Sequence, residues 1–228
     1  MNPVQIIETG DGSHSLLNVA MDETYHSRHG ALRESEHVFI RHGLHHWITQ
    51  HPTASTLRIL EVGFGTGLNA ILTVREARPR PDLSFRYTTL EPHPLAEEII
   101  NSLNYLALLN DTSLAPHFAA LHQAPWEADQ SLLDNFVLHK TQSTLQDFPT
   151  APQAFDLIYF DAFAPNKQPE LWTLPVLQCV ATLMASGAIF VTYSAKGQLK
   201  RDLKALELLV ETLDGPPGKA EMVRAQKP

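Results

Sequence analysis

The stretch Ile59-Leu60-Glu61-Val62-Gly63-Phe64-Gly65-Thr66-Gly67-Leu68-Asn69 decides the fold. The apolar run from Leu57 to Val62 has the length of a buried strand, and three glycines at alternate positions follow it. A helical pattern of apolar residues then begins at Leu68. A strand, a glycine turn and the start of a helix form a ligand-binding loop in open α/β sheets. The stretch therefore predicts a binding site at the end of a central strand.

The spacing of the glycines separates two classes of cofactor. A dinucleotide loop needs G-x-G-x-x-G, which seats a pyrophosphate on the helix N-terminus. This chain has E-x-G-x-G-x-G from Glu61 to Gly67, which suits a ligand without phosphate that packs against the backbone. The pattern resembles the first motif of S-adenosylmethionine-dependent methyltransferases, and this resemblance implies S-adenosylmethionine as the cofactor. Glycines that serve only a tight turn are the alternative.

Composition describes an ordinary globular protein. The 228 residues are 43% hydrophobic and 18% charged, which predicts one domain with a sizeable core. Apolar runs stay short of the ~20 residues of a membrane helix, and the N-terminus lacks the layout of a signal peptide. A single cysteine, Cys179, excludes a disulfide framework and favours a reducing compartment, so we expect a cytoplasmic protein. The net charge of -8 argues against a general nucleic-acid binder.

From Ser55 onwards, strands and helices alternate. The pattern predicts five main strands at residues 57–62, 84–90, 135–139, 155–160 and 188–193, with helices at 66–77, 95–106, 170–185 and 197–208. Short helices are expected around Phe118 and Trp126. Two last strands, 209–213 and 220–224, predict an antiparallel hairpin, which is how class I methyltransferases end. We therefore expect an α/β, Rossmann-like methyltransferase domain with a mostly parallel sheet at residues 54–228.

Residues 1–53 stand outside this repeat and predict an N-terminal extension that packs on the catalytic domain. Strands at 5–9 and 15–19 would form a hairpin, and helices would follow with breaks near Gly30 and Gly43. Histidines are dense here, but neither H-E-x-x-H nor C-x-x-C is present, so we predict no metal site. The histidines are His26, His29, His37, His42, His45 and His46.

Two acids belong to the expected cofactor site. Glu91 ends the second strand, where a carboxylate of a doubly wound fold accepts hydrogen bonds from ribose hydroxyls. Glu61 lies inside the first strand, and a buried acid without a partner is rare. We therefore expect Glu61 near the methionine end of the cofactor. The loop residues expected to complete the site are Gly63, Gly65, Thr66, Gly67 and Asn69.

Asp161 follows the fourth strand, at the sheet edge where ligands bind. A carboxylate here suits an amine nucleophile, because an alkylammonium has no lone pair and its pKa lies about three units above neutral. Asp161 could orient such an amine and accept its proton. We also expect Asp161 and the nearby Phe163 to contact the cofactor. A cap for the following helix is the alternative role of Asp161.

Six motifs make the resemblance specific. They resemble the MnmD family and the methyltransferase half of the bifunctional MnmC proteins, over nearly the whole chain. This resemblance implies N-methylation of 5-aminomethyl-2-thiouridine at the tRNA wobble position, giving 5-methylaminomethyl-2-thiouridine. The motifs are D-G-S-H (11–14), E-x-Y-H-S-x-H-G-A (23–31), E-S-x-H-V-F-I (34–40), L-E-V-G-F-G-T-G-L-N (60–69), D-x-I-Y-F-D-A-F-A-P-x-K-x-P-E-L-W (156–172) and G-P-P-G-K-x-E-M (215–222).

The sequence departs from this family after the third strand. Relatives often carry Gly-Asp there, with the acid on the adenine amino group, whereas this chain has Lys140-Thr141-Gln142. Thr141 is therefore the residue expected beside the adenine. No flavin-binding oxidase half follows Pro228, so we expect the methyl step alone. A small-molecule amine methyltransferase, a cofactor sensor without catalysis and an NAD-dependent oxidoreductase are the rival interpretations, the last disfavoured by the glycine spacing.

Substrate contacts are expected from both ends of the chain. Tyr25 could stack on a splayed-out base, and Glu34 could hold an aminomethyl group as an ammonium. An acidic protein that binds tRNA must gather positive charge beside its cleft, because phosphate contacts dominate affinity. The residues expected to supply this charge are Lys196, Arg201, Lys219 and Arg224.

Overall fold

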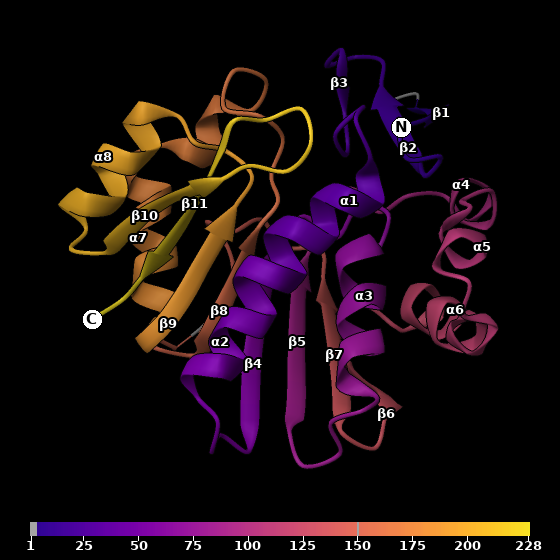
Figure 1. The fold of residues 1–228 in the computed structure, drawn as a ribbon, viewed down its shortest axis with the longest axis horizontal. Coiled ribbons are helices and arrows are strands. Elements are labelled where there is room, and N and C mark those ends of the chain that lie inside the picture. The colour runs from indigo at the N-terminus through magenta and orange to yellow at the C-terminus, as the bar shows by residue number, and fades with distance from the viewer. Residues whose placement is uncertain (1–3, 150) are drawn as a thin grey trace.

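The computed structural model describes residues 4–149 and 151–228. Residues 1–3, the start of the predicted extension, and residue 150 lie outside the described residues. Eight strands form the central sheet in the order β10-β11-β9-β8-β4-β5-β7-β6 (Figure 1). In chain order they are β4 (Thr56–Val62), β5 (Ser84–Leu90), β6 (Asp129–Leu133), β7 (Phe136–Thr141), β8 (Phe155–Phe160), β9 (Met184–Thr192), β10 (Leu209–Asp214) and β11 (Glu221–Gln226).

The sheet is parallel at its centre and antiparallel at both ends. β4 pairs in parallel with β5 and β8, β5 with β7, and β8 with β9. β11 runs antiparallel to both β9 and β10, and β6 runs antiparallel to β7. This arrangement confirms the predicted α/β fold with a C-terminal antiparallel hairpin. β6 was not predicted, because Asp129-Gln130-Ser131 is too polar to read as a strand.

Helices cover both faces of the sheet because its central strands are apolar on both sides. In β8, Leu157 and Tyr159 join the apolar cluster on one face, and Ile158 and Phe160 join the cluster on the other. The first face is covered by α3 (Leu68–Ala77) and by a long helix at residues 31–50. The second is covered by α7 (Leu174–Leu183) and α8 (Gly197–Ala205).

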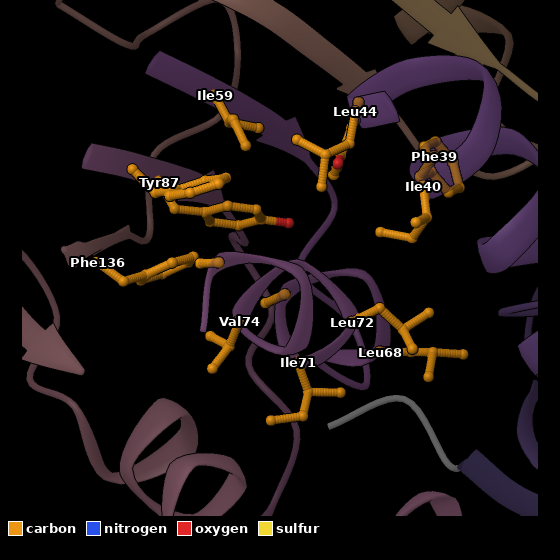
Figure 2. Close-up of a cluster of buried hydrophobic side chains, with 14 of the residues drawn as sticks. Phe39, Ile40, Leu44, Ile59, Leu68, Ile71, Leu72, Val74, Tyr87 and Phe136 are labelled. Atoms are coloured by element: carbon orange, nitrogen blue, oxygen red, sulfur yellow. The ribbon is translucent and has the colours of Figure 1, made fainter. Parts of the chain in front are cut away.

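Figure 2 shows the core of the first face, seen along α3. Ile71 and Val74 of α3 lie against aromatic side chains of the sheet, and Tyr87 and Phe136 stack with ring centroids 5.8 Å apart. Side chains of the long helix, among them Phe39, close the same cluster. The start of α3 is thereby fixed against the sheet, and with it the glycine loop that precedes α3.

The long helix was predicted with a break at Gly43, and that prediction was wrong. The helix runs without interruption as α1 (Ala31–Ser35), a π-helical stretch η1 (Glu36–His45) and α2 (His46–Gln50). A Cβ at Gly43 would lie 3.0 Å from Cγ2 of Val191 and 3.2 Å from Cε1 of Tyr159. The glycine is therefore needed for close packing of helix on sheet rather than for ending the helix.

Other element boundaries also differ from the prediction. Residues 95–106 form two helices, α4 (Glu97–Asn101) and α5 (Tyr105–Leu109), separated by Asn104. The Asn104 amide donates to the carbonyl of Gly12 and accepts from the backbone N–H of His14, so the break ties this region to the extension. The helix predicted at 170–185 is divided into η3 (Pro169–Trp172) and α7, and β9 begins early, at Met184.

The region after α5 fits the prediction in part. η2 (Thr112–Leu114) leads into α6 (Ala115–Gln123), which confirms the helix around Phe118. The helix expected around Trp126 is absent, because Trp126 instead pairs with Lys140 as a short parallel bridge. Glu127, the next residue, has a φ of 58°, which a helix cannot accommodate.

The N-terminal extension forms a small antiparallel sheet of β1 (Val4–Glu8), β2 (His14–Asn18) and β3 (Glu23–Thr24), and so contains the predicted hairpin. It lies over the carboxyl ends of the parallel strands, at the top of Figure 1. The predicted boundary at residues 53 and 54 falls in the turn between α2 and β4. The division into extension and catalytic domain stays a prediction, because the long helix shares one core with α3. Within the described chain, no helix has the length and apolarity to cross a membrane.

We expect Gly43→Val to lower the free energy of unfolding by about 1–3 kcal/mol, because the added methyl groups would overpack against Val191 and Tyr159. Denaturant unfolding measures the change. Arg41→Val is the matched control, since Arg41 lies on the exposed side of the same helix and should change stability by only about 0.5 kcal/mol. Equal stability of the two variants would contradict the close packing at Gly43.

Candidate functional site

A cavity of about 930 Å³ opens at the carboxyl ends of β4, β5 and β8. Four segments of the sheet edge line it, and the extension closes it with Tyr25 and His26. Its size is that of a small-molecule site, and its place is where ligands bind in doubly wound folds. The four segments are residues 62–65, 90–96, 143–145 and 161–163.

The glycine loop leaves space that any side chain would fill. Gly63, Gly65 and Gly67 have φ angles of 94°, 50° and 72°, where glycine is favoured. A Cβ at Gly63 would lie 2.8 Å from the carbonyl oxygen of Asp161, and one at Gly65 would lie 3.1 Å from the ring of Tyr25. Gly63 and Gly65 line the cavity, whereas Gly67 faces His122 at the start of α3. The loop therefore fits a ligand that packs directly on backbone.

Thr66 is turned away from the cavity and joins two other segments to the loop. It is fully buried, and its hydroxyl bonds Nε2 of His26 at 2.9 Å and accepts from the Tyr105 hydroxyl at 3.1 Å. Burial lowers the pKa of His26 to about 4, so the imidazole is neutral at pH 7. Thr66 thus fastens the extension to the glycine loop.

Glu91 lines the cavity with its carboxylate fixed by backbone. One oxygen accepts from the N–H of Gly65 at 2.9 Å, and the other accepts from the N–H of His93 at 2.9 Å. Each oxygen keeps a lone pair for a second donor, as a diol would require. The acid at the end of β5 therefore also sets the position of the glycine loop.

Asp161 and Asn69 meet at the cavity wall. The Asn69 amide donates to Oδ2 of Asp161 at 2.8 Å, and both residues line the cavity. Burial raises the pKa of Asp161 to about 7, the charge of Glu34 adds to the rise, and the Asn69 hydrogen bond opposes it. Asp161 caps neither following helix, because η3 is preceded by Gln168 and α7 by Thr173. The carboxyl group is thus free for chemistry and titrates near neutral pH.

Glu61 lies beneath the cavity and does not line it. Its Oε2 accepts from the Thr89 hydroxyl at 2.8 Å, and burial raises its pKa to about 8. Three buried polar atoms in this region have no hydrogen-bond partner among the described residues, namely Oε1 of Glu61, Oδ1 of Asn69 and the Tyr87 hydroxyl. All three atoms are inaccessible from the cavity, so they belong to the packing beneath it rather than to a contact with a ligand.

Thr141 does not line the cavity. Its buried hydroxyl donates to Oε1 of Glu127 at 2.9 Å. The cavity is lined instead by Ser143, Thr144 and Leu145, which follow β7. Sequence reasoning missed this segment, although its place after a parallel strand is the signal that singled out Glu91 after β5.

Lys140, next to Thr141, is buried in an aromatic setting. Its Nζ donates to the carbonyl of His122 at 2.8 Å and lies 4.6 Å from the Trp126 ring centroid. Burial lowers the pKa of Lys140 to about 8. The lysine thus holds the region behind Phe64 of the glycine loop, whose ring centroid lies 5.6 Å from Nζ.

Tyr25 and Phe163 form an aromatic pair on the cavity wall. Their ring centroids are 5.1 Å apart and their planes lie at 84°. The carbonyl of Phe163 accepts from Nε1 of Trp172 at 2.8 Å, which fixes the loop after β8. The structure thus brings these two predicted residues together with Asp161.

The other predicted substrate residues are divided between four places. Glu34 is 3% exposed and pairs with Lys219, beside Asp161. Lys196 is exposed at a second hollow of about 410 Å³, which Lys219 also lines. Arg201 is exposed on α8. Arg224 pairs with Glu211 at 2.7 Å on the side of the long helix, so its charge is already matched.

Three of the histidines in residues 26–46 have a hydrogen-bond partner for the ring, namely His26, His37 and His45. His37 bonds the carbonyl of Asp214 at 2.8 Å, and His45 bonds Glu76 at 2.7 Å. Across residues 4–149 and 151–228, no three side chains of the metal-ligating types come together. His26, His37 and His45 thus make contacts between elements, and the absence of a metal site stays a prediction.

The strand order, the glycine loop and the acid after β5 are those of the class I S-adenosyl-L-methionine-dependent methyltransferase fold. Residues 119–228 match the family model described as S-adenosyl-L-methionine-dependent methyltransferase. The tRNA 5-methylaminomethyl-2-thiouridine biosynthesis bifunctional protein MnmC of Burkholderia multivorans is 29% identical over 97% of this chain. The protein of the same name from Burkholderia mallei is 31% identical over 97%. The chain spans about a third of these relatives, 34% and 35% of their lengths.

Solved structures show the same fold. The chain matches MNMC2 from Aquifex aeolicus with a TM-score of 0.79 and 24% identity, over 100% of this chain and 72% of that one. A spermidine synthase from Thermotoga maritima matches with a TM-score of 0.53 and 13% identity, over 98% and 70%. These structures show the fold. The sequence relatives confirm the resemblance to the MnmC proteins, and the description of the matching family model supports S-adenosylmethionine as the cofactor.

We expect Gly65→Val to weaken S-adenosylmethionine binding roughly tenfold or more, because the side chain would enter the cavity against Tyr25 and overpack it. Calorimetric titration measures the affinity. Gly187→Val is the matched control, because Gly187 has a similar φ of 79° but does not line the cavity. The Gly187→Val protein should be less stable than wild type but should bind S-adenosylmethionine with the same affinity. Undiminished binding by the Gly65 variant would remove this loop from the site.

Proposed function

We propose that this protein methylates the primary amine of 5-aminomethyl-2-thiouridine at the tRNA wobble position, giving 5-methylaminomethyl-2-thiouridine. Two observations support the proposal. The chain is similar over 97% of its length to proteins of 5-methylaminomethyl-2-thiouridine biosynthesis. In addition, a carboxyl group suited to an amine nucleophile lies in the wall of the cofactor cavity. We further propose that the reaction takes place in the cytoplasm. This compartment contains the tRNA and is reducing, which fits the free thiol of Cys179.

The position of the Asp161 carboxyl group in the cavity wall is the observation that carries the proposal. An alkylammonium must lose a proton before its nitrogen has a lone pair for attack, and a carboxylate can accept that proton and orient the neutral amine. With its pKa raised to about 7, Asp161 is a better proton acceptor than an ordinary aspartate and is still largely ionised just above neutrality. The hydrogen bond from Asn69 holds the carboxylate toward the cavity.

The cofactor would supply an electrophilic methyl group on a sulfonium centre. Gly63 and Gly65 would pack against it, and Glu91 would accept hydrogen bonds from its ribose hydroxyls. Asn69 and Asp161, which line the cavity, would lie at the methionine end of the cofactor, with Glu61 beneath. Ser143, Thr144 and Leu145, which line the cavity, would lie beside the adenine in place of Thr141.

The nucleoside would enter past Tyr25 and Phe163. Aromatic rings of this kind stack on unpaired bases, and a wobble nucleotide can be splayed out of the anticodon loop. Lys196 and Arg201, both exposed, would contact phosphates beside the second hollow. Arg224 is a weaker candidate for such a contact, because Glu211 neutralises it.

A small-molecule amine is the second candidate substrate, and the net charge of -8 favours it. One experiment separates the two. Purified protein is incubated with labelled S-adenosylmethionine and tRNA from cells that lack the final methyl step, and the tRNA is digested to nucleosides. Label in 5-methylaminomethyl-2-thiouridine supports the tRNA substrate. Protein that loads the cofactor but leaves this tRNA unlabelled contradicts it.

Asp161→Asn should lower the rate of methyl transfer by about 100-fold, the usual scale for a positioned acid–base group. The wild-type rate should fall as the pH drops below about 7, because the Asp161 carboxylate is then protonated and can no longer accept a proton. In the variant this dependence on Asp161 should be lost. Single-turnover rates across a pH series measure both effects.

Asp134→Asn is the control, because Asp134 is an exposed acid in the turn between β6 and β7, outside the cavity. It should keep the wild-type rate and pH profile. Cofactor binding is measured for both variants, so that a loss of binding is not mistaken for a loss of chemistry. A near wild-type rate in Asp161→Asn would leave this carboxylate without a catalytic role.

Replacing Lys196 and Arg201 together with alanine should weaken tRNA binding and flatten its dependence on salt by up to about two units of log K against log salt concentration. Each lost phosphate contact removes about one released counterion. Filter binding over a salt series measures the slope, and cofactor affinity should not change. An unaltered slope would mean that these side chains form only a solvated surface.

A further inference from the structure

The loop between β10 and β11 reaches across the molecule to the N-terminal helix. This loop, residues 215–219, lies beside α1 at the top of Figure 1. Its Lys219 forms an ion pair with Glu34 of α1, and Nζ lies 3.7 Å from the centroid of the Tyr193 ring. The ammonium is therefore held by a carboxylate and an aromatic face together, an arrangement that stabilises a cation.

Two glycines fix where Lys219 lies. Gly218 has a φ of 87°, and a Cβ there would overlap the imidazole of His29 in the extension. A Cβ at Gly215 would overlap the carbonyl of Lys219. The N–H of Lys219 donates to the carbonyl of Pro216 at 2.9 Å, which closes the turn. The G-P-P-G-K motif thus presses the loop against the extension and delivers one ammonium to one place.

Glu34 needs this ammonium because it is almost fully buried. One of its oxygens accepts from the N–H of Ser27 at 2.9 Å, and the other faces Lys219. A buried carboxylate without a cation is strongly unfavourable. Glu34 is also close enough to Asp161 for its charge to act on the Asp161 carboxyl group. Lys219 therefore completes a set of three charges at the methyl-transfer site.

We propose that Lys219 is a positioning residue, which holds the Glu34 carboxylate beside Asp161 and is not a phosphate contact. The inference rests on the proposed function for its chemical purpose, because Asp161 is the proposed proton acceptor. With Lys219 paired to it, Glu34 is not available to hold a substrate ammonium. The pair instead sets the charge around Asp161, in which Glu34 and Lys219 act in opposite directions.

The titratable groups that face Asp161 come from every element packed around it. Besides Glu34 and Lys219 they are Glu61, Tyr87, Tyr105 and Tyr193. Burial raises the pKa of all three tyrosines, so these stay neutral at pH 7. Burial also raises the pKa of Glu61 to about 8, which leaves it mostly protonated. The charges of Glu34 and Lys219 are therefore the ones that the variants below change.

The test follows the Asp161 side-chain carboxyl carbon by NMR during a pH titration of the cofactor-free protein. In Lys219→Met the midpoint should move up, because a positive charge that stabilises the carboxylate is gone. Lys219→Arg keeps the charge and should keep the wild-type midpoint. Lys204→Met removes an exposed lysine of α8 that does not approach Asp161, so its midpoint should also match wild type.

Glu34→Gln completes a double-mutant cycle. Alone it should move the Asp161 midpoint down, because a negative charge is lost. Combined with Lys219→Met it should bring the midpoint back toward wild type, since both charges are then absent. The double variant also avoids the unpaired buried carboxylate that could unfold Lys219→Met. The pH profile of methyl transfer should shift in the same direction as each midpoint.

A midpoint that stays in place in Lys219→Met, with a flatter salt dependence of tRNA binding, would overturn the inference and make Lys219 a phosphate contact. The titration needs neither tRNA nor cofactor. A wild-type protein that leaves tRNA unmethylated therefore contradicts the proposed function, whereas the NMR midpoints still decide the role of Lys219.

Discussion

The close approach of Gly63 to the Asp161 backbone is the constraint on which the site depends. A side chain at Gly63 would collide with the Asp161 carbonyl, only 2.8 Å from its Cβ. Because β4 and β8 are neighbours in the sheet, this contact brings the cofactor loop and the acid to one wall of one cavity. The other contacts at the site build on this close approach of two strands, which the absence of a side chain at Gly63 allows.

Hydrogen bonds between distant segments then hold this wall. Glu91 accepts from the backbone of Gly65, so the acid after β5 also supports the loop after β4. Thr66 joins His26 of the extension to Tyr105 of α5 through one hydroxyl. The extension is therefore part of the site's framework, although its sequence does not belong to the strand–helix repeat. The cavity forms only when the extension and the strand–helix repeat are folded together, because residues of both line it.

The parts that could be predicted from sequence are those set by local patterns. The strands at 84–90 and 155–160 were predicted to the residue. The first is rich in aromatic residues and threonine and ends before Glu91-Pro92, and the second is mostly apolar and ends before Asp161. Gly43 was misread, because a helix-breaking glycine and one that allows close packing look alike in sequence. The pairing of Glu34 with Lys219 could not be predicted, since 185 residues separate the two and only the folded chain joins them.

The order of strands at the C-terminal edge has a consequence for how the protein folds during its synthesis on the ribosome. β10 precedes β11 in the chain, yet β11 lies between β10 and β9 in the sheet. β10 therefore has no place to pair until residues 221–226 have been synthesised. Lys219 belongs to the same late segment, so a nascent chain holds Glu34 without its cation. Synthesis thus delays the pairing of Glu34 with Lys219 until the end of the chain has been made.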